Sequence, residues 1–187
     1  EQEEYSIKAN ESTTEFQVTD KQFLAYRYYF LNQEARSKYV DAAILGRSVS
    51  NYKVTDLKLY KRSALNTSDN VIKNVNVVYT TPQGKTITKT VDRMVEIPST
   101  EFTYDSRTGI VKINGVNRNT LVAANYSNES RKGKMLRDGG EAVLIQWDAV
   151  LSELTDIDKL MLRNVYSIGI SDASANNFVL RMKNKSS

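Results

Sequence analysis

The side chains of this sequence that could do chemistry are carboxylates, lysines, tyrosines and hydroxyls, because its 187 residues include no histidine and no cysteine. The chain therefore cannot build a Ser-His-Asp triad, a cysteine nucleophile, a zinc finger or a disulfide from its own residues. Asp156 and Asp158 are spaced like oxygen ligands of a metal, but the calcium-loop pattern with its central glycine is absent. We interpret the pair as a solvated turn.

Two further classes of enzyme need less specialised residues. A glycosidase requires two carboxylates at a suitable separation, and nothing in the sequence selects such a pair. A nucleotide hydrolase requires a phosphate-binding loop, but the GxxxxGK[ST] pattern is absent, and Gly139-Gly140 precedes an apolar run instead of a helix. We therefore expect a non-enzymatic protein with no catalytic residue, no cofactor and no metal.

Charge is unevenly distributed along the chain. The whole sequence carries 26 Lys and Arg against 22 Asp and Glu, a net charge of +4. Its first 20 residues contain six acidic side chains and only Lys8, so they carry −5 and the other 167 residues carry +9. This pattern divides the chain into an acidic arm, residues 1–18, and a single basic domain, residues 19–187.

The acidic arm has weak strand character, since Tyr5 and Ile7, and later Phe16 and Val18, alternate with polar residues. We expect these four side chains to contact a partner surface by strand addition. No apolar run approaches the ~18 residues that a membrane-spanning helix needs, so we expect no transmembrane segment. The sequence does not begin with Met, which fits either a processed form or a trimmed chain.

A long helix is predicted from about residue 20 to about residue 45. Thr19 and Gln22 have the spacing of a capping box, and Gly46 suits the position just after a helix end. An apolar stripe recurs every three or four residues through Leu24, Tyr28, Leu31, Ala35, Tyr39 and Ala42. The segment holds more aromatic surface than one stripe can bury, so a curved sheet or another subunit should cover the rest. The candidate interface residues here are Tyr26, Tyr29 and Phe30.

Beyond residue 51 the apolar period changes to two, which predicts strands. The strand that starts at Tyr52 has a phase slip at Thr55 and Asp56, which indicates a β-bulge. The turn Thr81-Pro82-Gln83-Gly84 has the signature of a type I turn and joins a hairpin. Its strands are 71–79 and 85–97, and further strands are expected at 102–104, 110–113, 121–124, 142–147, 165–170 and 178–182. Residues 148–162 fit a short helix or a strand.

The predicted fold class is α+β and mostly β. It consists of the long N-terminal helix packed on one mainly antiparallel sheet of about seven to nine strands, with room for a second short helix. Residues 125–141 lack periodicity and are interpreted as a mobile basic loop. The basic residues of this loop are Arg131, Lys132, Lys134 and Arg137.

A second group of basic residues lies on the strands between positions 53 and 93. It consists of Lys53, Lys58, Lys61, Arg62, Lys73, Lys85, Lys89 and Arg93. Such a sheet surface can bind nucleic acid, although lysine on exposed strands is also a common protection against edge-to-edge aggregation. Nucleic-acid binding is therefore an alternative that ranks below protein contacts.

The function favoured by these patterns is that of a structural or assembly subunit of a virion, filament or cell surface. Its acidic arm would dock on a neighbouring copy or on another structural protein. The stretch Tyr104-Asp105-Ser106-Arg107-Thr108-Gly109, leading into Ile113-Asn114-Gly115, resembles hairpins of phage tail and surface-fibre proteins. A composition rich in Asn, Thr, Ser and Tyr favours an extracellular, envelope or virion location over the cytoplasm.

A second hypothesis starts from the order of the predicted elements. A long helix followed by a long-stranded antiparallel meander is similar to the NTF2-like class, which implies a soluble accessory domain of an envelope or secretion machine. That fold would require the long helix to lie in a cradle formed by the sheet.

Overall fold

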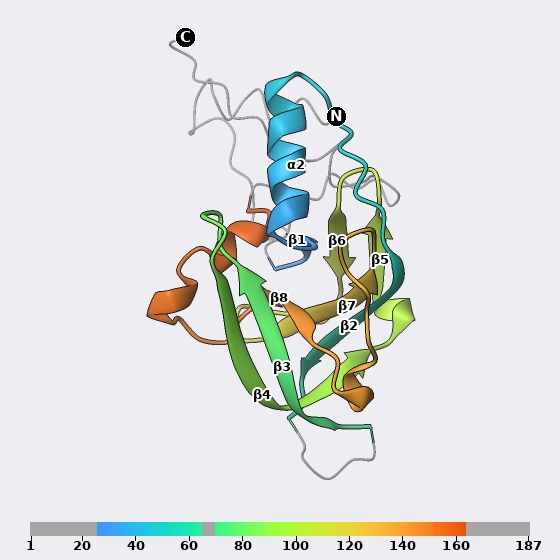
Figure 1. The fold of residues 1–187 in the computed structure, drawn as a ribbon, viewed down its shortest axis with the longest axis vertical. Coiled ribbons are helices and arrows are strands. Elements are labelled where there is room, and N and C mark those ends of the chain that lie inside the picture. Colours follow the sequence, from blue (N-terminus) through green and yellow to red (C-terminus); the bar gives the residue numbers. More distant parts are fainter. Residues whose placement is uncertain (1–25, 65–69, 164–187) are drawn as a thin grey trace, which may run out of the picture.

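The computed structural model describes residues 26–64 and 70–163. These residues form eight strands in two sheets, one of which is a closed barrel, together with a single α-helix (Figure 1). The described part of the chain is therefore mostly β, as the sequence predicted.

The barrel has five strands, each paired with two neighbours. They are β2 (Thr55–Arg62), β3 (Ile72–Thr80), β4 (Thr86–Ile97), β7 (Val122–Ser127) and β8 (Ala142–Gln146). Their order is β2-β4-β3-β8-β7, and pairing of β7 with β2 closes the ring. All neighbours run antiparallel except β3 and β8, which are parallel. Closure leaves the barrel without an edge strand.

The second sheet has three strands in the order β1-β6-β5. They are β1 (Tyr28–Phe30), β5 (Phe102–Asp105) and β6 (Ile110–Ile113). The helix α2 (Gln33–Ile44) follows β1 and projects away from the barrel (Figure 1). Four short 3-10 helices complete the described structure: η1 (Ser99–Glu101), η2 (Leu136–Asp138), η3 (Ser152–Leu154) and η4 (Ile157–Leu160).

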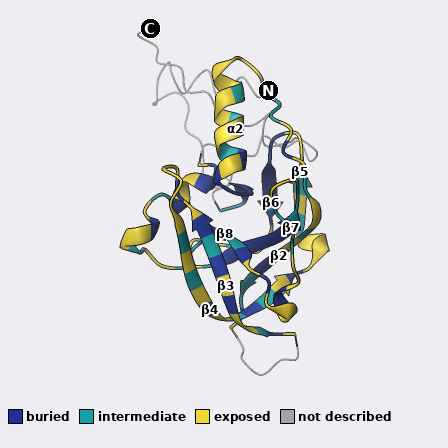
Figure 2. Cartoon of the chain, viewed as in Figure 1, coloured by how far each residue is buried: buried dark blue, intermediate teal, exposed yellow. Residues whose placement is uncertain are grey.

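Two apolar cores hold the molecule together (Figure 2). All five barrel strands contribute to the first, which fills the barrel with Tyr60, Val77, Val91, Ala123 and Leu144 among others. The sequence neighbours Leu59, Val122 and Ile145 belong to the second core, with Tyr29 and Val111 of the small sheet. Because strand side chains alternate between faces, neighbouring apolar residues serve opposite cores. The small sheet therefore packs one face, with Tyr29 and Val111, against the outside of the barrel, while Tyr28, Phe30 and Ile110 on its other face join the first core.

The predicted long N-terminal helix is wrong. The helix begins after Asn32, whose side chain accepts a hydrogen bond from the Ala35 N–H at 2.7 Å, and it has 12 residues. Tyr28–Phe30 instead forms β1, and all three of its side chains are buried. A run of bulky aromatic residues buried on both faces suits a strand better than an amphipathic helix, which buries only one face. The predicted cap at Thr19 lies outside the described residues.

The end of the helix and the two hairpin turns were predicted correctly. Gly46 has a φ of 74° and donates to Ala43 O, and the next N–H, of Arg47, donates to Ala42 O, the pattern of a Schellman motif. The hairpin of β3 and β4 turns at Thr81–Gly84 and closes with a 2.9 Å bond from the Gly84 N–H to Thr81 O. The second hairpin joins β5 and β6.

The first barrel strand was predicted in part. The pairing of β2 with β7 slips between Thr55 and Lys58, and Asp56 has a φ of 55°, so the predicted irregularity at this point is confirmed. The strand itself begins at Thr55 and not at Tyr52.

The single predicted sheet of seven to nine strands is replaced by the barrel and the small sheet. In the segment 148–162, for which helix and strand were both open, the structure has η3 and η4. The strands expected at 165–170 and 178–182 lie outside the described residues. Within the described ranges, no helix is long and apolar enough to span a membrane. The helix α2 projects from the barrel, so the cradled long helix required by the NTF2-like hypothesis is not present in this part of the chain.

Candidate functional site

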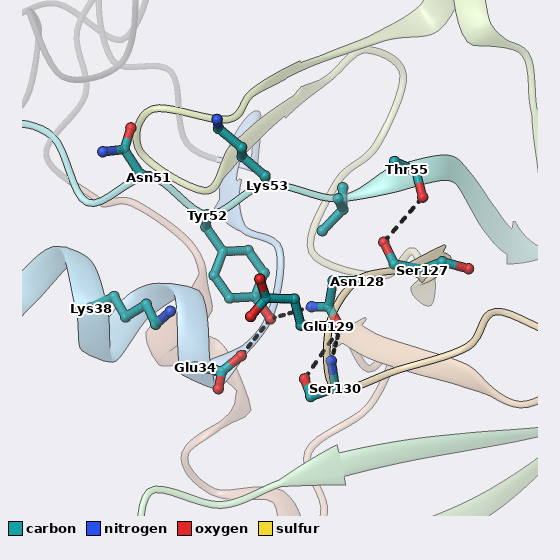
Figure 3. A pocket seen from close by; sticks show the side chains of 11 residues that line it. Glu34, Lys38, Asn51, Tyr52, Lys53, Thr55, Ser127, Asn128, Glu129 and Ser130 are labelled. Atoms are coloured by element: carbon teal, nitrogen blue, oxygen red, sulfur yellow. Dashed lines mark hydrogen bonds between the residues drawn. The ribbon is translucent and has the colours of Figure 1, made fainter.

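A groove lies where the first turn of α2 meets the β3–β4 turn and the loop after β7. We call it the tyrosine groove, because Tyr52, Tyr79 and Tyr126 line it. Its volume is about 550 Å³, within the range of small-molecule sites. A second hollow of about 630 Å³ adjoins it and shares Glu34 and Tyr52 (Figure 3).

Asn32 connects the helix to the tyrosines. While its Oδ1 caps α2, its Nδ2 donates to the Tyr52 hydroxyl at 2.9 Å and to the Tyr126 hydroxyl at 2.5 Å. The Tyr52 hydroxyl donates to Glu34 Oε1 at 2.7 Å and accepts from Asn128 Nδ2 at 3.2 Å (Figure 3). This network joins α2, the segment before β2 and the loop after β7, so it fixes the shape of the groove.

The tyrosines of this network are neutral hydrogen-bonding groups. Burial, which disfavours the phenolate, raises the pKa of Tyr52, and the same cause raises the pKa of Tyr126. Burial also raises the pKa of Tyr104, whose hydroxyl donates to the Tyr52 carbonyl. A phenol with a raised pKa is a poor base and a poor nucleophile near neutral pH. These tyrosines are thus suited to hydrogen bonding as neutral groups.

Two residues that line the groove each bury a side-chain polar atom that has no hydrogen-bond partner. The two atoms are Oε1 of Gln33, a residue that is 8% exposed, and the hydroxyl of Tyr79, which is 2% exposed. The Gln33 amide is otherwise held by a 3.2 Å bond from Nε2 to the Ser37 hydroxyl. The sequence offered no signal for either residue, because one lies in a helix and the other on a strand 46 positions later.

Arg131 of the predicted basic loop is a structural residue. Its Nη2 donates to Asn125 Oδ1 at 2.9 Å and to the Glu141 carbonyl at 2.6 Å, and its Nε donates to the Tyr126 carbonyl at 3.2 Å. The guanidinium also lies 5.2 Å from the centre of the Tyr126 ring. These bonds tie the loop to the barrel.

The other residues of the basic loop do not gather around Arg131. Lys132 and Lys134 are exposed, and Arg137 is exposed in η2. The first three residues of the predicted loop, 125–127, belong to β7.

Several basic residues of the barrel strands are paired with carboxylates. Arg62 bonds Asp92 at 2.5 Å and Asp148 at 2.8 Å. The other pairs are Lys58 with Glu96, Lys89 with Glu153, and Arg93 with Asp92. Because partners already neutralise these four cations, the strand surface is less suited to phosphate backbones than the sequence indicated.

The aromatic interface candidates lie mostly in the interior. Tyr29 and Phe30 are buried in the chain's own cores, and the Tyr29 hydroxyl donates to Gln146 Oε1 at 3.1 Å. Tyr26 is half-buried and its backbone N–H faces the Met161 sulfur at 3.3 Å. The arm candidates Tyr5, Ile7, Phe16 and Val18 lie outside the described residues.

The projecting half of α2 carries an apolar surface that the sequence prediction missed. Val40, Ile44 and Leu45 are 37%, 77% and 69% exposed; we call them the α2 patch. Figure 2 shows that α2 is exposed along most of its length. The signal that could have found the patch is the i, i+4 spacing of Val40 and Ile44, off the predicted apolar stripe.

No protein-family model and no curated protein matches this chain. The site must therefore be interpreted from its own chemistry. Among residues 26–64 and 70–163, no group of three or more acidic side chains is placed to hold a metal ion. Two features of the described surface suit binding, the tyrosine groove and the α2 patch.

Proposed function

We propose that this protein is a non-catalytic assembly subunit, in which the acidic arm of one copy docks on the α2 patch of another. The observation that carries the proposal is the exposure of Ile44 and Leu45 on a helix that projects from the barrel. Large apolar side chains that are grouped and exposed mark contact surfaces more often than scattered ones do.

Charge favours the arm as the occupant. The charged side chains on and just after α2 are Arg36, Lys38 and Arg47 against Glu34 and Asp41, so this segment carries a net charge of +1. The first 20 residues carry −5 and include four apolar side chains, at Tyr5, Ile7, Phe16 and Val18. An acidic segment with interspersed apolar residues complements an apolar patch on a segment of net positive charge, and charge steering speeds such an encounter.

The barrel changes the expected mode of docking. Strand addition needs a free edge, and the closed barrel has none. The outer edge of β1 is also engaged, since Tyr29 bridges Met161 and the Leu162 N–H donates to Tyr28 O at 2.8 Å. Among the described strands, β5 is paired on one side only and keeps an outer edge, but the grouped apolar side chains on α2 favour the helix surface as the docking site.

Binding of an arm to a different surface on the next copy is a head-to-tail contact. Such contacts generate rings when the rotation closes and filaments when it does not. This property supports a structural role in a virion, filament or cell surface.

The proposal is tested by measuring molar mass by light scattering over a range of protein concentrations. We expect the mass of the full chain to rise with concentration and to fall when salt is added, because screening weakens the charge attraction. Ile44→Lys combined with Leu45→Lys should give a monomer, as should a chain without residues 1–18 whose circular dichroism shows the same fold. Val150→Lys is the matched control, because Val150 is 96% exposed and lies far from α2 in the sequence.

A full chain that stays monomeric at the highest soluble concentration contradicts assembly. If the α2 variants lower the mass and removal of the arm does not, the arm is not the occupant of the α2 patch. If Val150→Lys lowers the mass as much as the α2 variants do, the contact does not depend on α2.

A further inference from the structure

We propose that the tyrosine groove binds a neutral ligand with several hydroxyl groups, of the saccharide class. The two unpartnered atoms, Gln33 Oε1 and the Tyr79 hydroxyl, are the primary contacts. Both belong to side chains that are more than nine-tenths buried and that line the same groove. Native structures rarely bury polar atoms without a partner, so each exception calls for an explanation such as a ligand.

The chemistry of the two atoms restricts the ligand. An amide oxygen only accepts hydrogen bonds, whereas a phenol both donates and accepts. The ligand must therefore donate to Gln33 and bond in either sense to Tyr79. A hydroxyl group meets both requirements, and a molecule with two or more hydroxyls meets them together.

Charge at the groove disfavours ionic ligands of either sign. The Glu34 carboxylate lines the groove beside Gln33 and repels an anion. Arg131 also lines it, and Asp156, Arg36 and Asp158 all act electrostatically on the Tyr79 hydroxyl, so charges of both signs surround these atoms and an ion of either sign meets repulsion. A neutral ligand avoids both penalties.

The walls of the groove suit a sugar ring. Residues with hydroxyl groups line the groove on α2, at the end of β3 and its turn, and in the loop after β7: Ser37, Thr80, Thr81 and Ser130. Val78, Pro82, Val143 and Leu144 add apolar surface, against which the C–H faces of a sugar can pack. Polar groups placed around a partly apolar pocket are the common design of small-molecule sites.

The test uses saturation-transfer NMR and calorimetry on the full chain with glucose, galactose, N-acetylglucosamine, cellobiose and lactose. We expect at least one of these sugars to bind saturably at millimolar concentration. Tyr79→Phe and Gln33→Met should each weaken that binding at least tenfold, because each removes one unpartnered atom and keeps the side-chain volume. Tyr60→Phe is the matched control and should bind normally, since Tyr60 is a buried barrel tyrosine outside the groove.

Thermal unfolding separates loss of a contact from loss of the fold. Without ligand, Tyr79→Phe should melt at the wild-type temperature or above it, because it deletes a buried hydroxyl that bonds to nothing. A binding loss in a variant that melts normally supports the site. Failure of all five sugars to bind overturns the proposal, as does binding that survives both groove variants.

Two charged probes, inorganic phosphate and spermidine, complete the test. Saturable binding of either one at the groove, with no sugar binding, overturns the assignment of a neutral ligand. The inference is independent of assembly, because it concerns the groove and not the α2 patch, and each can fail while the other holds.

Discussion

Among the polar residues of the groove, Asn32 should lower the free energy of unfolding most when it is replaced, because its side chain both caps the helix and binds two tyrosines. Its Oδ1 caps α2, and its Nδ2 holds the hydroxyls of Tyr52 and Tyr126. Loss of a helix cap costs about 1 kcal/mol. Leaving the buried Tyr126 hydroxyl without its donor costs about 1–3 kcal/mol more. We therefore expect Asn32→Ala to lower the free energy of unfolding by about 2–4 kcal/mol.

The two contributions can be separated by a second variant. Asn32→Ser keeps a side-chain oxygen that caps helices well, but it cannot reach the tyrosines as a donor. Asn32→Ser should therefore lower the free energy of unfolding only by the cost of leaving the Tyr126 hydroxyl without its donor, about 1–3 kcal/mol. Tyr52 should contribute little to this loss, because its hydroxyl still donates to Glu34 and accepts from Asn128.

Urea unfolding followed by circular dichroism and by the fluorescence of Trp147, the single tryptophan, measures these differences. Asn119→Ala is the control: this asparagine is exposed, so the change should stay within about 0.5 kcal/mol. In a Tyr126→Phe background, Asn32→Ala should cost less than it does in the wild type, because the partner hydroxyl is already gone. An Asn32→Ala loss below about 0.5 kcal/mol, or equal losses in both backgrounds, would refute this reasoning.

Two further predictions concern backbone strain and alkaline pH. Gly109→Ala should lower the free energy of unfolding in urea more than Gly84→Ala does. Both glycines have a positive φ, but a Cβ at Gly109 would lie 2.8 Å from the Ala35 Cβ, whereas a Cβ at Gly84 would meet open space. Equal losses would contradict this reasoning. Burial, with Asp156 nearby, raises the pKa of Tyr79 from 10.0 to about 12, so the unfolded chain loses this proton first and the free energy of unfolding falls as the pH rises from 10 through 12. Tyr79→Phe should therefore make the free energy of unfolding less sensitive to alkali over that range, as measured by urea unfolding at fixed pH, and an unchanged sensitivity would contradict the assignment.

The turns and caps were predictable because their conformations depend on local chemistry. Glycine tolerates positive φ, which explains why Gly46 ends the helix and why Gly84 fits the turn of the first hairpin. The phase slip at Thr55 and Asp56 was visible because a bulge shifts the alternation of apolar residues. Such features need no knowledge of the rest of the chain.

The start of the helix was not predictable in the same way. Thr19 and Asn32 are both acceptable caps, and the apolar spacing between them fits a helix. What decides against a helix is that β1 is held between β6 on one side and Met161 on the other. These contacts join residues at least 80 positions apart in the sequence, so tertiary pairing overrides the local pattern. Closure of the barrel by β2 and β7 is non-local for the same reason.

The absence of histidine and cysteine limits catalysis but says nothing about binding through hydroxyl and amide groups. Gln33 lies in a helix and Tyr79 in a strand, and neither residue alone indicates a binding site in the sequence. They become a site because the helix begins at Asn32, which places the first turn of α2 beside the end of β3. The tertiary pairing of β1 that sets the start of α2 therefore also places the first turn of α2 at the groove and leaves Ile44 and Leu45 exposed on the projecting end of the helix.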